Sequence, residues 1–119
     1  MSTPIALKFG KDANNLNAYA PIPSNNKTSA TLTNGNAVSF TVPYTESLWL
    51  VSFRFQPGTT VWIDATGVTA AEPAGASFAN TTSEMNPASL TVAGGTVISC
   101  ITAFASADVS VVMWQVGNP

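Results

Sequence analysis

The C-terminal part of the chain carries the pattern that most constrains the fold. Three runs rich in Val, Ile, Thr and aromatic residues are separated by short stretches of Gly, Ser, Ala and Asp, and they occupy residues 88–93, 96–104 and 109–116. Such runs, bounded by turn residues, are typical of β-strands joined by tight turns. The pattern therefore predicts three consecutive strands at the end of the chain.

The last two of these runs are apolar on both faces, because side chains alternate across a strand. In the final run the two faces carry Val109, Val111 and Met113 on one side and Val112, Trp114 and Val116 on the other. A small sandwich uses only one face of each sheet for its core, so the other face needs a cover. We predict that the face with Trp114 lies in the core and that the face with Val111 contacts a neighbouring subunit.

Upstream runs extend the β pattern over most of the chain. They lie at 28–33, 37–42, 47–55 and 59–64. Asn34-Gly35 between the first two predicts a type I′ hairpin, and Pro57-Gly58 between the last two fits a type II turn. In 47–55, alternation places Trp49, Val51, Phe53 and Phe55 on one face, which we assign to the core. Eight or nine short strands at this spacing predict an all-β sandwich or barrel.

Two segments are less regular than the rest. At 119 residues the chain is expected to form one domain, 1–119. Within it, residues 1–23 contain two candidate short strands and form either part of the core or an arm laid over a neighbour. Residues 65–87 predict a long loop that contains a short strand at 76–80 and a brief helical turn at 82–85. Phe78 and Met85 are the apolar side chains expected to anchor it.

The composition argues against most catalytic chemistry. The chain has no histidine and a single cysteine, Cys100, so Ser–His and Cys–His pairs and the usual zinc and iron–sulfur sites are excluded. Cys100 lies in an apolar run and is expected to be a buried, reduced thiol. None of the six acidic residues falls in a catalytic motif. We therefore predict no enzyme activity, no catalytic residue and no cofactor, while calcium binding through Asp12 and Asn14, or near Asp64 and Asp108, stays open.

The balance of charge points to an assembly. Charged residues make up 8% of the chain, against about 25% in typical soluble domains. Four basic residues are too few for strong nucleic-acid binding, and neither a secretory signal nor a membrane span is expected. Weak charge gives little protection against self-association, although a secreted β-module would have the same composition. The residues that we predict at subunit interfaces are Phe9, Tyr19, Tyr44, Trp62, Phe78, Val109, Val111 and Met113. For Trp62, a core position and a sugar-stacking platform are the alternatives.

Segments 77–99 and 107–112 resemble the C-terminal half of small structural proteins of tailed-phage virions, in particular capsid decoration (cement) proteins. The resemblance implies a jelly-roll-like antiparallel β-sandwich of about eight strands that forms a homo-oligomer, often a trimer, on the capsid surface. The resemblance also implies that the partners of this chain are other copies of the same chain and the major capsid protein, and that the particle is assembled in the host cytoplasm. A tail or head-fibre component and a carbohydrate-binding module using Trp62 or Tyr44 are the alternatives.

Overall fold

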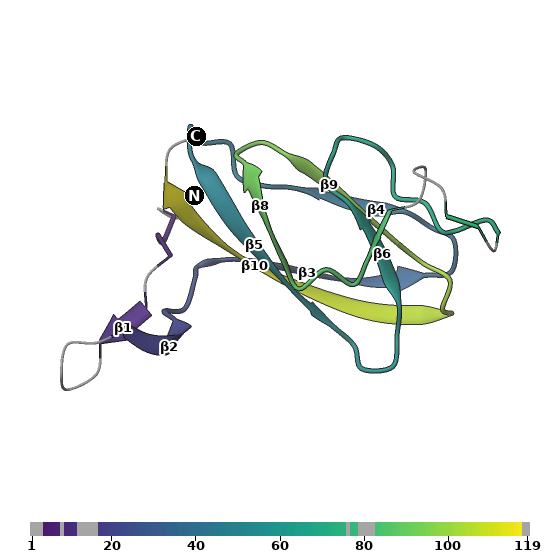
Figure 1. The fold of residues 1–119 in the computed structure, drawn as a ribbon, viewed down its shortest axis with the longest axis horizontal. Helices are drawn as coiled ribbons and strands as arrows, with labels where there is room; N and C mark the ends of the chain where they lie inside the picture. The colour runs from purple at the N-terminus through teal and green to yellow at the C-terminus, as the bar shows by residue number, and fades with distance from the viewer. Residues whose placement is uncertain (1–3, 8, 12–16, 76, 79–82, 118–119) are drawn as a thin grey trace.

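The computed structural model describes residues 4–7, 9–11, 17–75, 77–78 and 83–117. Within this part of the chain there are ten strands and no helix. The strands are β1 (Phe9–Lys11), β2 (Asn17–Pro21), β3 (Asn26–Thr33), β4 (Val38–Thr41), β5 (Leu48–Phe55), β6 (Val61–Asp64), β7 (Glu84–Met85), β8 (Ser89–Ala93), β9 (Val97–Thr102) and β10 (Ser106–Gly117). Eight of them form a two-layered sandwich, and β1 and β2 form a small hairpin that projects from one end of it (Figure 1).

The two layers are antiparallel sheets with the orders β3-β10-β5-β8 and β4-β9-β6-β7. The first and last strands of the sandwich, β3 and β10, are therefore neighbours. Every connection from β3 to β10 except that between β6 and β7 crosses from one sheet to the other. This is the strand arrangement of a jelly roll. The predicted all-β, jelly-roll-like sandwich of about eight strands is confirmed.

The turn predicted at Asn34-Gly35 is wrong. Since β3 and β4 belong to different sheets, these residues make a crossing connection and do not close a hairpin. Only Gly35 has a positive φ there, 74°, whereas a type I′ turn needs positive φ at both central positions. The backbone N–H of Gly35 donates instead to Thr102 of the other sheet, at 2.9 Å.

The core lies between the two sheets and contains the predicted aromatic face of β5. Trp49, Val51 and Phe53 are buried, and Phe55 packs against them at the rim. From the opposite sheet, Val61, Ile63, Ile98 and Cys100 complete the same cluster. Trp49 keeps a polar partner, because its indole Nε1 donates to Thr45 Oγ1 at 2.9 Å.

The two faces of β10 are the reverse of the prediction. Val109, Val111 and Met113 are all buried in the core cluster. The cause is the register with β5, in which Val111 lies opposite Phe53 and Met113 opposite Val51. Residues directly opposite in an antiparallel pair share a face, so the aromatic face of β5 carries these β10 residues inward.

Trp114 is buried for a different reason. It lies on the outer face of β10 but is only 5% exposed, and its indole Nε1 donates to the carbonyl of Ile22 at 2.8 Å. The segment around Ile5 also pairs with the end of β10, where Gln115 exchanges backbone hydrogen bonds with Ile5 and Leu7. The segment around Ile5 thus extends the sheet along β10, and Ile22 lies against Trp114, while Val116, predicted in the core, is 38% exposed.

The irregular segment at 65–87 is fixed mainly by polar contacts. Its strand is β7, so the helical turn predicted there is wrong, and of the predicted strand 76–80 only Ser77 and Phe78 are described, neither of them in a strand. Phe78 and Met85 are exposed and do not anchor the loop. Anchoring comes instead from Asn86, whose side chain bonds to the backbone of Val61 and Thr59.

Candidate functional site

The predicted interface residues occupy very different environments. Val109, Val111 and Met113 are core residues, so the prediction that they face a neighbour is wrong. Tyr44 is 86% exposed beside Gly95, and Phe78 is fully exposed in the loop before β7. Trp62 is half-buried on the outer face of the β4-β9-β6-β7 sheet. The side chains of Phe9 and Tyr19 lie outside the described residues. The structure does not bring the six described side chains together.

A more coherent group surrounds Trp62. Directly opposite Trp62 lie Ile101 of β9 and Met85 of β7, so the three side chains form one row across three strands. Met85 is 57% exposed, and on the same sheet face Val97 of β9 is 46% exposed. The loop after β6 adds Val68, 61% exposed, beside Val97. We call Trp62, Val68, Met85, Val97 and Ile101 the outer patch.

Of this group, the sequence predicts only Trp62 as an interface residue. The alternation of Val97 and Ile101 is visible in the sequence, but the place of Ile101 directly opposite Trp62 depends on the register between β9 and β6. Met85 joins the row because β7 pairs with β6, which local sequence did not indicate.

Asp64 ends β6, two residues after Trp62 and on the same face of the strand. Its carboxylate accepts hydrogen bonds from the Thr66 backbone N–H at 2.8 Å and from the Thr66 hydroxyl at 2.5 Å, and Ser83 Oγ lies 3.4 Å away. The Thr66 hydroxyl is the main cause that lowers the pKa of Asp64 below its usual range. The three donors, two from Thr66 and one from Ser83, tie the loop after β6 to the Asp64 carboxylate. Because these hydrogen bonds keep the carboxylate ionised, it is poorly suited to act as a general acid.

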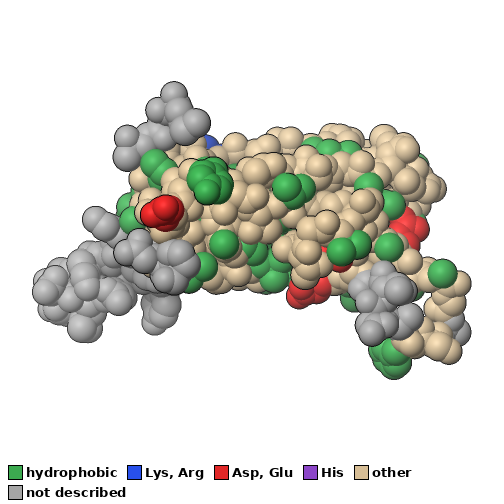
Figure 2. Space-filling model, turned by 90° about the horizontal axis from the view of Figure 1, so that it is seen from above, with side chains coloured by type: hydrophobic (Ala, Val, Ile, Leu, Met, Phe, Trp, Pro, Cys, Tyr) green, Lys and Arg blue, Asp and Glu red, His purple; other side chains and the backbone are tan. Residues whose placement is uncertain are grey.

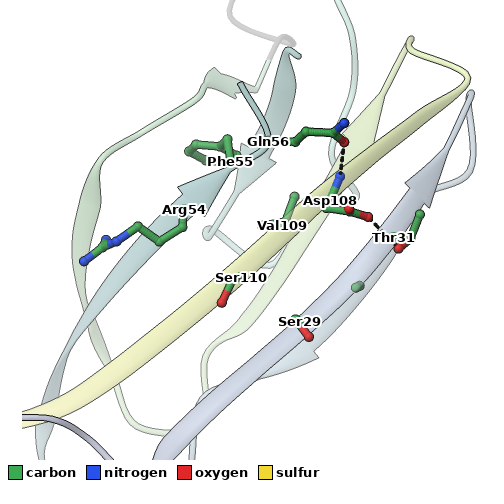
Figure 3. A pocket seen from close by; sticks show the side chains of 9 residues that line it. Ser29, Thr31, Arg54, Phe55, Gln56, Asp108, Val109 and Ser110 are labelled. Carbon is green, nitrogen blue, oxygen red and sulfur yellow. Dashed lines mark hydrogen bonds between the residues drawn. The ribbon is translucent and has the colours of Figure 1, made fainter. Parts of the chain in front are cut away.

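A polar trough of about 580 Å³ lies on the outer face of the other sheet (Figure 3). Ser29, Ser110 and Arg54 stand in one row across β3, β10 and β5. In the next row Thr31 donates its hydroxyl to Asp108 at 2.6 Å. The Arg54 side chain points away from Asp108 and donates from Nη1 to Ser52 Oγ and to the carbonyl of Phe53. Hydroxyls with one cation and one carboxylate suit recognition of a small polar ligand.

A second hollow opens between the two sheets along the edges of β3 and β4. This crevice has a volume of about 160 Å³, with Ala30, Val38 and Phe40 at its sides and Val111 and Cys100 among its deeper residues. Cys100 is 4% exposed, and burial raises the pKa of its thiol to about 11. The thiol is therefore protonated at neutral pH, which makes it a poor nucleophile.

Within the described ranges, no group of three or more His, Cys, Asp or Glu side chains is placed to hold a metal ion. The same part of the chain contains no helix that is long and apolar enough to span a membrane. Comparison of the chain with protein-family models, with curated proteins and with solved structures found no match.

Proposed function

We propose that the protein is a structural subunit of a virus particle, namely a decoration protein on the head of a tailed phage. The observation that supports this function best is the outer patch, in which an aromatic, a thioether and two aliphatic side chains share one outer sheet face and Val68 of the loop after β6 adds a third aliphatic side chain. Aromatic residues and Met are enriched in protein interfaces, and charged residues are depleted from interface centres. The outer patch has that composition.

The rest of the surface supports the same proposal. The chain carries only four basic and six acidic residues, and the face in Figure 2 shows scattered hydrophobic side chains with few charged groups. Such a surface is poorly protected against association in free solution. It suits a protein that spends its lifetime bound to a larger structure.

The protein would stabilise the phage head by burying the apolar side chains of the outer patch against a partner subunit. The outer patch lies on a sheet whose backbone is already paired, so it can be covered by a partner without local unfolding. An interface of about 1,600 Å² would gain tens of kcal/mol gross at about 25 cal/mol per Å², most of which association costs offset. The hairpin β1–β2 projects from the sandwich, whose longest extent with the hairpin is 52 Å, and would reach a neighbouring subunit.

The test is binding to particles. Purified protein is added to phage heads that lack it, from a phage whose genome encodes the chain, and bound protein is measured after sedimentation. The double variant Trp62→Ser/Met85→Ser should lose binding, whereas Phe104→Ser should bind like wild type, because Phe104 is exposed in the turn after β9, outside the outer patch. Equal binding of all three proteins would contradict the role of the outer patch.

Binding to purified tails and not to heads would instead identify a tail or fibre component. A carbohydrate-binding module remains the second candidate, and the polar trough is the observation that favours it. Saccharides would bind through the hydroxyls of the trough together with Arg54 and Asp108. Calorimetric titration with a glycan panel tests this candidate: binding that disappears in Arg54→Ala would support it, and silence across the panel would count against it.

A further inference from the structure

Within the described residues, strand β3 is an edge strand with little of the usual protection against pairing. It is eight residues long, lies at the margin of its sheet and follows β10 in continuous register without a bulge. Proteins commonly protect such edges with charges, prolines, bulges or a covering segment. Asn26–Thr33 contains no proline, and its only charged residue is Lys27.

The hydrogen bonds of Gln115 show which backbone groups of β3 are available. Both its N–H and its C=O point to the β3 side of β10, since they bond to Ile5 and Leu7. Backbone groups alternate in direction along a strand, so the N–H and C=O groups of Val109 and Val111 also point towards β3. Their partners there are Ala30 and Thr28, respectively. The backbone groups of Lys27, Ser29 and Thr31 therefore face the free edge.

The side chains at this edge are small, and the sandwich is open beside them. Thr28 and Ala30 lie on the inward face of β3, opposite the buried Val111 and Val109, yet Ala30 is exposed. Across the crevice, Val38 of β4 is 41% exposed. An additional strand along β3 would pair with the free backbone groups and would cover the crevice with every second side chain.

We propose that this strand is β3 of a second copy, paired antiparallel about a two-fold axis at Ser29. With the axis at Ser29, Ser29 meets the second copy's Ser29, and Thr28 meets the second copy's Ala30. In each pair the two side chains share a face, as residues directly opposite in a sheet must. The backbone groups of Lys27 then bond with those of the second copy's Thr31. The result is one continuous eight-stranded sheet across two sandwiches.

Charge complementarity selects this register. Thr31 lies opposite Asp108 on β10 and is hydrogen-bonded to it, so Lys27 enters the same row as the second copy's Asp108. The two side chains are then two strand spacings apart, about 10 Å at the backbone, which a lysine stem and a carboxylate can bridge. A shift by two residues would place Lys27 opposite Thr33, next to Ser106, and would remove the carboxylate from its row. Each dimer forms this contact twice.

The pairing goes beyond the proposed function, because it joins two free copies and leaves the outer patch uncovered. Edge pairing buries little area, so we expect a weak dimer whose population rises with concentration. Sedimentation equilibrium of the full chain up to about 1 mM should show this dimer. A wild-type protein that stays monomeric over that range would overturn the proposal.

Two sets of variants locate the contact. Ser29→Pro removes an N–H that faces the free edge and should abolish the dimer with an unchanged thermal unfolding curve, since proline is tolerated at sheet edges. Lys27→Glu should weaken dimerisation roughly tenfold, and Lys27→Glu/Asp108→Lys should restore it. A dimer that persists in folded Ser29→Pro, or that Trp62→Ser/Met85→Ser abolishes instead, would overturn the assignment to β3. Particle binding of Ser29→Pro, measured in parallel, reports on the proposed function separately.

Discussion

Replacing Val111 or Val112 by alanine tests the two faces of β10 with the same chemical change. The residues are adjacent, but Val111 is 2% exposed in the core and Val112 is half-buried on the outer face. Val111→Ala removes two buried methyl groups, worth about 1.6 kcal/mol at about 0.8 kcal/mol each. The cavity left among Phe53, Val109 and the opposite sheet raises the expected cost to about 2–2.5 kcal/mol. Val112→Ala should cost less than about 1 kcal/mol, because part of its side chain stays in contact with water.

Urea and thermal unfolding, followed by circular dichroism on both variants, measure this difference. For a chain of this length, about 2 kcal/mol lowers Tm by roughly 8 °C. The ratio between the variants matters more than either value, because both changes alter β propensity equally. A loss for Val112→Ala as large as that for Val111→Ala would refute the inward assignment of Val109, Val111 and Met113.

Three further predictions concern single side chains. Because the pKa of Asp64 is lowered in the fold, its carboxylate stabilises the protein above the unfolded pKa near 3.9 and loses this effect as the pH falls through the folded value. Asp64→Asn should therefore be less stable than wild type at pH 7 in urea unfolding, with the gap closing in acid. Cys100, with a pKa of about 11, should react with a disulfide reagent at pH 7 roughly two orders of magnitude more slowly than a free cysteine until urea unfolds the chain; fast labelling of the native state would contradict its burial. Gly94→Ala would place its Cβ 2.3 Å from the Thr45 carbonyl oxygen and should cost about 1–3 kcal/mol, whereas Gly75→Ala, with open space around it, should be close to neutral.

Local sequence was sufficient to locate the strands but not to pair them. Runs of β-branched residues predict strands because propensity and alternation act within a few residues. Which face of β10 is inward depends on its register with β5, a contact between residues about 60 positions apart along the chain. Asn34-Gly35 shows the same limit, because a turn signal does not specify whether the next strand returns to the same sheet.

The candidate site was predictable only in part, for the same reason. The sequence predicts Trp62 as a large apolar residue on the face of its strand that is opposite to the face of Val61 and Ile63. Its neighbours in the outer patch come from β7, β9 and a loop, and only the sheet order brings them together. Trp114 shows the converse, since it is buried by a segment around Ile22 that is 92 positions away.

We propose that this jelly roll is a structural subunit of a phage head. The most direct measurement is quantitative mass spectrometry of purified heads from a phage whose genome encodes the chain. The proposal predicts the protein in the heads at a fixed copy number relative to the major capsid protein. Recovery of the protein only from the soluble fraction of the lysate, with none in heads, would contradict it.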